Sequence, residues 1–120
     1  MLSTSFGSSG PSVVALLLAY VVLVAPVAEE TLFRGAIQRR LRVSIGRWPA
    51  IALASVPFLS LHIFNYVGGS PLALGLAFGN LFVVSSVFGY VYDRSETLTV
   101  PVVVHVVYNG TLVGVSALGL

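Results

Sequence analysis

Five side chains that could take part in acid–base or hydrogen-bond chemistry lie within otherwise apolar stretches of this sequence. They are Glu29, Glu30, His62, His105 and Asn109. A charged side chain at the centre of a bilayer costs about 2.5–3.5 kcal/mol, so such residues normally face a protein interior or a wet cavity and mark a functional site. Carboxylates and imidazoles can exchange protons or bind a metal ion, and an amide can donate hydrogen bonds to a developing negative charge.

These residues are predicted to lie at similar depths in the membrane. With a helical rise of 1.5 Å per residue, Glu29 lies ~20 Å from Arg42, which flanks its span. His62 lies ~22 Å from Arg47, which flanks the next span. His105 and Asn109 lie ~16 Å and ~22 Å from Arg94. Three separate spans therefore bring their polar groups to one layer.

Helical spacing also groups these residues in pairs, because residues four apart share a helix face. Three pairs meet this condition: Phe58 with His62, His105 with Asn109, and Glu30 with Arg34. Each polar residue has a structural interpretation as well. Glu30 and Arg34 could form an ion pair that holds the helices together, a single histidine could be a packing residue, and Asn109 could join two helices. The matched depth of the whole set favours a functional site.

The composition indicates a membrane protein. Of 120 residues, 57% are hydrophobic and 8% are charged, whereas soluble domains carry about 25% charged residues. The basic residues are six arginines, five of them between Arg34 and Arg47, a clustering that fits a membrane-flanking loop and not a nucleic-acid surface. The absence of cysteine excludes disulfides, thiolate zinc sites and a cysteine nucleophile.

The apolar stretches predict an all-α polytopic membrane protein whose core is a bundle of four transmembrane helices. The spans are expected at about 12–41, 48–67, 71–92 and 98–120, after a flexible tail at 1–10. The short breaks between spans require antiparallel neighbours. All six arginines fall at one end of the bundle, which predicts that the loops bearing them face the cytoplasm. The arginine-only, valine-rich and alanine-rich composition indicates a prokaryotic cell membrane.

Three motifs occur in order on three of these spans. They are Glu-Glu-x-x-x-Arg at 29–34, Phe-x-x-x-His at 58–62 and His-x-x-x-Asn at 105–109. In these motifs the chain resembles the CPBP family of intramembrane proteases, which includes CAAX prenyl endopeptidases and bacteriocin-processing and immunity proteins. The resemblance covers roughly Pro11 to the end, so residues 11–120 are expected to form the protease core.

The resemblance implies a membrane endopeptidase that uses an activated water. Glu29 would be the general base for attack of that water on a peptide carbonyl, and His62 would orient the water. Asn109 and His105 would donate hydrogen bonds to the oxyanion. The supporting residues would be Glu30, Arg34 and Phe58. Prenylated C-terminal peptides, bacteriocin leaders and other membrane-proximal peptides are all candidate substrates, and membrane lipids are the other expected partner.

Three alternatives differ in mechanism. Glu29, His62 and His105 offer the three nitrogen and oxygen ligands of a catalytic zinc, with water as the fourth; the metal-free mechanism, without a cofactor, is favoured here. A serine protease would have to use the Gly-Ser-Ser-Gly run at 7–10, which precedes the first span and cannot meet either histidine at depth. A non-enzymatic immunity or scaffold protein could retain the motifs without turnover.

Overall fold

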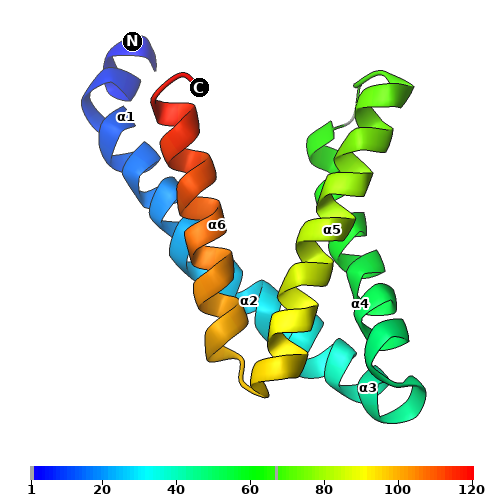
Figure 1. Ribbon diagram of the computed structural model, residues 1–120. Coiled ribbons are helices and arrows are strands. Elements are labelled where there is room, and N and C mark those ends of the chain that lie inside the picture. Colours follow the sequence, from blue (N-terminus) through cyan, green and yellow to red (C-terminus); the bar gives the residue numbers. More distant parts are fainter. Residues whose placement is uncertain (1, 67) are drawn as a thin grey trace.

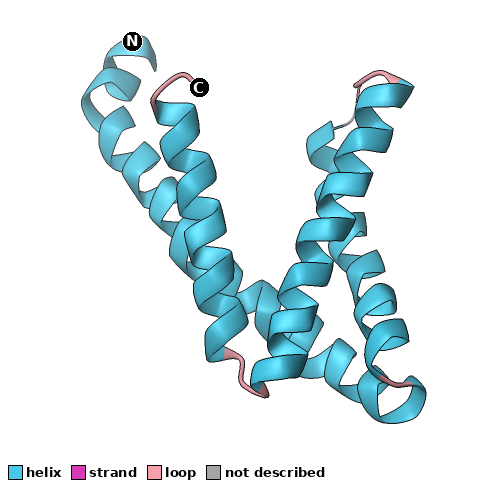
Figure 2. Cartoon of the chain, in the orientation of Figure 1, coloured by secondary structure: helices cyan, strands magenta, loops and turns pink. Residues whose placement is uncertain are grey.

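The computed structural model describes the backbone of residues 2–66 and 68–120, and the surroundings of the side chains from residue 10 onward except residues 65 and 67. Helices account for 91% of the residues that the structure describes, and that part contains no strand (Figure 2). The predicted all-α class is therefore confirmed.

One long helix forms the amino-terminal third of the chain. It consists of α1 (Leu2–Ala19), the π-helical η1 (Tyr20–Val24), α2 (Ala25–Glu30), the π-helical η2 (Thr31–Gln38) and α3 (Arg39–Ile45). The backbone of the expected flexible tail is helical from Leu2 onward, and Pro11 lies inside α1. Proline removes one backbone hydrogen bond, but membrane helices tolerate this loss, so the helix can continue through it.

Two π-helical segments flank the stretch that bears the glutamates. In a π-helix the hydrogen bonds join residues five apart, and such segments are frequent at functional sites. Pro26, the second residue after η1, has no N–H, so it cannot make the hydrogen bond that an α-helix would form to the carbonyl of Val22. Glu29 and Glu30 therefore end a short α-helical stretch between two irregular ones.

The second helix is shorter than expected. A turn at Gly46, whose φ of 87° suits glycine, leads into α4 (Arg47–His62), and the 3₁₀ turn η3 (Ile63–Tyr66) follows α4. α4 contains 16 residues, fewer than the roughly 20 that cross a hydrocarbon core. The expected span at 48–67 is therefore not established by α4 alone.

The remaining helices are α5 (Pro71–Ser95) and α6 (Thr99–Ala117). Ser70 caps α5 by accepting a backbone hydrogen bond at 3.1 Å. Pro71 takes the first helical position, where its missing N–H would have no partner in any case. Glu96, with a φ of 55°, ends α5 and turns the chain toward α6.

Three helices of the described chain are long and apolar enough to cross a membrane. They are Gly10–Ile45, Pro71–Ser95 and Thr99–Ala117. Many of their large hydrophobic side chains are exposed, including Leu16 at 71% and Leu76 at 67%. An exposed apolar surface of this extent is suited to lipid rather than to water. The chain is therefore an integral membrane protein.

The helices form two arms that diverge from a common base (Figure 1). α6 packs against η1 and α2 in one arm, α4 and α5 pack against each other in the second arm, and η2 and α3 connect the two. The turn at Gly46 and the turn between α5 and α6 both lie at the base. α4 and α5 therefore run antiparallel, as the short loops predict, whereas α5 and α6 diverge from the turn between them, so Figure 1 shows two arms in place of the expected bundle of four.

A small aromatic core holds together the helices that carry the polar residues. Its buried members are Phe33 in η2, Phe58 in α4, and Leu81 and Phe88 in α5. Phe58 packs edge-on against Phe33, with ring centroids 5.6 Å apart, and against Phe88 at 6.4 Å. Each such aromatic pair contributes about 0.5–1.5 kcal/mol beyond the area it buries.

Gly89 marks the closest approach of α5 to its neighbours. An added Cβ there would lie 2.7 Å from Oε1 of Gln38 and 3.1 Å from Cγ2 of Ile51. Gln38 is buried and donates to the carbonyl of Gly89 at 2.8 Å, so it cannot move away without losing that bond. We therefore expect Gly89→Ala to lower the free energy of unfolding by about 1–3 kcal/mol, measured by denaturation in mixed micelles.

Gly79 in the same helix provides the matched control. An added Cβ there would meet nothing within 4 Å. Gly79→Ala should therefore leave stability unchanged or raise it by up to about 1 kcal/mol, because alanine favours the helix. Equal effects of the two substitutions would contradict the close packing at Gly89.

Candidate active site

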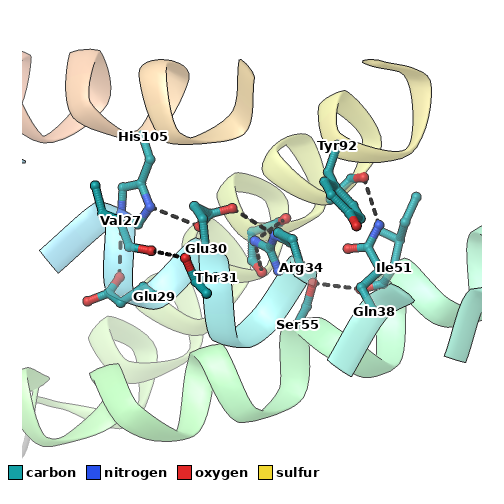
Figure 3. Close-up of polar contacts among 12 residues, drawn as sticks. Val27, Glu29, Glu30, Thr31, Arg34, Gln38, Ile51, Ser55, Tyr92 and His105 are labelled. Atoms are coloured by element: carbon teal, nitrogen blue, oxygen red, sulfur yellow. Dashed lines mark hydrogen bonds and ion pairs between the residues drawn. The ribbon is translucent and has the colours of Figure 1, made fainter. Parts of the chain in front are cut away.

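The two adjacent glutamates differ sharply in burial. The side chain of Glu30 is 0% exposed, whereas that of Glu29 is 26% exposed. Neighbouring residues on a helix point ~100° apart, and Figure 3 shows the two carboxylates on different sides of α2. A water molecule or a substrate can therefore reach Glu29 but not Glu30.

Glu30 and Arg34 form the ion pair that their spacing predicts. Nε of Arg34 donates to Oε1 of Glu30 at 3.0 Å, and neither side chain is exposed (Figure 3). Nη2 of Arg34 also donates to Ser85 in α5, to the backbone oxygen at 2.9 Å and to Oγ at 3.0 Å. The guanidinium lies 5.6 Å from the ring centroid of Phe58, within cation–π range. Arg34 thus joins the first helix to α5.

His105 lies between the two glutamates. Its Nδ1 is 2.9 Å from Oε2 of Glu30, and its Nε2 is 3.5 Å from Oε2 of Glu29 (Figure 3). Because Glu30 pairs with Arg34, its oxygens accept, so Nδ1 of His105 is the donor. The ring stacks on Phe88 with centroids 4.5 Å apart and is almost fully buried. The position of the imidazole is therefore fixed on both sides.

His62, the last residue of α4, approaches Glu29 from a third helix. Its Nδ1 lies 2.7 Å from the carbonyl oxygen of Phe58, which can only accept, so this nitrogen also carries a hydrogen. Its Nε2 lies 3.8 Å from Oε2 of Glu29. The ring stacks on that of Phe58 with centroids 4.4 Å apart. The shared face predicted for Phe58 and His62 is present, and it aims Nε2 toward Glu29.

The three polar atoms that converge here are all acceptors when both rings are neutral. Each imidazole donates from Nδ1, so each presents a lone pair at Nε2 to Oε2 of Glu29. That oxygen is buried and has no hydrogen-bond partner among the described residues. The arrangement therefore suits a species that supplies hydrogens or positive charge, such as water, a proton or a cation.

Asn109 makes a different contact from the one expected. Its Nδ2 donates to the backbone oxygen of Val21 in η1 at 2.9 Å. Val21 precedes Glu29 by two turns, so the contact lies toward the amino-terminal end of the first helix. The contact joins α6 to that helix and leaves the second Nδ2 hydrogen free for another acceptor. The role of Asn109 in an oxyanion site stays a prediction.

The sequence interpretation missed two buried polar residues that position this cluster. Ser85 binds Arg34 from α5, and Gln38 binds the carbonyl of Gly89 one turn further on. Both are essentially unexposed. A serine and a glutamine inside otherwise apolar helix faces were the available signals.

The zinc alternative requires three protein ligands around one point. Among the residues that the structure describes, no group of three or more His, Asp or Glu side chains is arranged to hold a metal ion. The zinc-dependent form of the mechanism stays a prediction.

Comparison with known families agrees with the motifs. The family model of type II CAAX prenyl endopeptidase Rce1-like proteins matches residues 11–111. The chain belongs to this Rce1-like family. No curated protein and no solved structure matched the chain. The expected membership among CPBP intramembrane proteases is confirmed, and the match includes every residue of the candidate site.

Membership gives the Rce1-like chain its general class. At the level of the family, it supports an intramembrane CAAX-type protease, that is, a peptidase embedded in the membrane. The three apolar helices agree with this location. Within the matched residues, Glu29, whose side chain is 26% exposed, faces the imidazoles of His62 and His105.

Proposed function

We propose that this Rce1-like chain is an intramembrane endopeptidase that cleaves a peptide bond near the membrane, close to the C-terminus of a prenylated or otherwise membrane-bound substrate. One observation carries the proposal. Oε2 of Glu29, on a partly exposed side chain, faces Nε2 of His105 at 3.5 Å and Nε2 of His62 at 3.8 Å. The carboxylate and one of the two acceptor nitrogens can accept the two hydrogens of a single water and so hold and polarise it.

In the proposed reaction Glu29 is the general base. It takes a proton from the water while the water oxygen forms a bond to the substrate carbonyl carbon, whose oxygen becomes negative. The C–N bond then breaks, and the proton held by Glu29 passes to the leaving amine. His62 orients the water through Nε2, since Nδ1 is already bound to its own helix.

The oxyanion would be stabilised by donors on α6. Asn109 has a second Nδ2 hydrogen beyond the one bound to Val21. His105 can donate from Nε2 only when its ring carries a second proton, and Glu30 on Nδ1 supplies the compensating negative charge. Glu30, Arg34 and Phe58 position these groups and do not touch the substrate.

The proposed membrane arrangement has four spans. α4 and η3 together cover the 20 residues from Arg47 to Tyr66, which matches the length needed for a crossing. Residues 11–120 would form the protease core, with the arginine-bearing turns toward the cytoplasm of a prokaryotic cell. The location of both arginine-bearing turns at one end supports this orientation.

A cleavage assay tests the function. The purified chain in lipid nanodiscs is incubated with a pool of prenylated and unprenylated peptides, and mass spectrometry identifies new products. We expect cleavage near the C-terminus of prenylated members, absent from a parallel sample of the Glu29→Gln variant. A folded wild-type protein that yields no product would contradict the proposal and favour the immunity or scaffold alternative.

The metal-free mechanism predicts resistance to chelation. After treatment with 1,10-phenanthroline and removal of the chelate, we expect the cleavage rate to stay unchanged, because Glu29 and the histidines act on water directly. The rate is measured on the product identified above, with and without added zinc. Loss of cleavage that zinc restores would instead establish the form in which Glu29, His62 and His105 bind the metal.

A further inference from the structure

A second polar region lies at the base of the molecule, away from the catalytic cluster. It is an open cavity of about 800 Å³, bounded by η2 and α3, the end of α5 and the start of α6. Three arginines (Arg39, Arg42 and Arg47) and two carboxylates (Asp93 and Glu96) line it, and neither Glu29 nor either histidine does. The cavity therefore needs an explanation separate from the proposed reaction.

The arginines of this cavity are only partly neutralised. Asp93 accepts from Nε of Arg42 at 2.7 Å and from Nε of Arg47 at 2.5 Å, so a single carboxylate serves two guanidinium groups. Both arginines use only Nε in these bonds, and their side chains are 45% and 36% exposed. Arg39 is exposed and makes no ion pair within the described chain. The Nη groups of all three can bind an oxyanion.

The surroundings place this cavity at the surface of the bilayer. Trp48, 63% exposed, stacks on Tyr90 with ring centroids 5.8 Å apart and ring planes 9° apart. Exposed tryptophan and tyrosine gather at the level of lipid headgroups. Val43 in the cavity wall is 88% exposed, and Leu98 adds a second apolar side chain. Cationic and apolar groups thus occur together, as a phospholipid would require.

We propose that this cavity binds the headgroup of an anionic phospholipid. The phosphate would lie among Arg39, Arg42 and Arg47, and the first part of an acyl chain would run along Val43 and Leu98. Asp93 would keep two of the guanidinium groups in position in the absence of lipid. This site is independent of peptide cleavage, so either proposal can fail without the other.

Lipid titration followed by native mass spectrometry tests the site. The delipidated full-length chain in detergent is titrated with dioleoyl-phosphatidylglycerol, with dioleoyl-phosphatidylcholine, or with inorganic phosphate. We expect tight one-to-one binding of phosphatidylglycerol, and weaker binding of phosphatidylcholine and of inorganic phosphate. Arg39→Gln should weaken the binding of phosphatidylglycerol about fivefold, the effect of one basic residue at an anionic surface. Arg39→Lys keeps the charge but not the planar guanidinium, so its affinity for phosphatidylglycerol should lie between those of the wild type and Arg39→Gln.

Arg94→Gln is the matched control. Arg94 is an exposed arginine at the same end of α5 and does not line the cavity. Its replacement should hardly change lipid binding, and circular dichroism should show both glutamine variants folded. Equal losses for Arg39→Gln and Arg94→Gln would mean diffuse attraction without a site. Equal affinity for phosphatidylcholine, or displacement by inorganic phosphate alone, would also overturn the proposal.

Discussion

Replacing Glu29 with glutamine is expected to lower the cleavage rate by about 10²–10⁴-fold, the usual contribution of a general base. Glutamine has nearly the same shape but cannot accept the proton of the attacking water. The measurement is the single-turnover rate on the peptide identified above, in nanodiscs. Glu29→Asp, which keeps a shorter carboxylate, should retain part of the activity.

The fold of the Glu29→Gln variant should be at least as stable as that of the wild type. Oε2 of Glu29 is buried without a hydrogen-bond donor, and it faces two acceptor nitrogens. A glutamine amide can donate to either nitrogen, which would satisfy groups that are unpaired now. Denaturation of both proteins in mixed micelles checks this expectation.

Glu96→Gln is the control for the Glu29 experiment. Glu96 is exposed at the end of α5, so the same chemical change occurs far from the cluster. Its variant should cleave at the wild-type rate. A Glu29→Gln protein that cleaves as fast as the Glu96→Gln protein would refute Glu29 as the base.

Replacing Arg34 with glutamine is expected to be the most destabilising single change in this chain. Arg34 and Glu30 are both unexposed, and removal of one partner of a buried ion pair costs about 3–5 kcal/mol because the other charge is left uncompensated. The change also removes two hydrogen bonds to Ser85, which hold α5 against the first helix. The free energy of unfolding in mixed micelles, followed by circular dichroism, measures the loss.

Two further variants show whether the loss comes from the ion pair. Arg40→Gln removes an exposed arginine of α3 and should change stability by less than about 1 kcal/mol. The double variant Glu30→Gln with Arg34→Gln contains no unpaired charge and should be more stable than Arg34→Gln alone. A double variant less stable than Arg34→Gln alone would contradict this explanation of the loss.

The sequence was informative wherever burial of a polar group in the membrane is costly. Ionisable residues in apolar spans need partners, so Glu29, His62 and His105 could be predicted to gather in one layer, and their atoms do face one another. The spacing of Glu30 and Arg34 likewise predicted their ion pair. Ser85 escaped notice because a hydroxyl in a helix usually bonds its own backbone and raises no demand for a partner.

Other features depend on packing that the sequence does not display. Counting the depth of Asn109 from Arg94 at a helical rise assumes one continuous helix between the two residues. The turn between α5 and α6 interrupts that helix. Helical spacing puts Asn109 on the face of His105, yet it cannot say which backbone oxygen of the first helix lies opposite. The sequence interpretation also did not include the π-helical η2 or the end of α4 at His62.

The contact of His105 with both glutamates also sets an order in time. A chain is made from its amino terminus, so Glu30 and Arg34, four residues apart, can pair as soon as the first helix forms. His62 arrives later, and His105, 75 residues beyond Glu30, arrives only with α6. Until α6 packs, Glu29 lacks one of its two imidazoles and Glu30 lacks its only one. Under the proposed mechanism, an unfinished chain in the membrane therefore lacks a complete site and cannot yet cut its neighbours or itself.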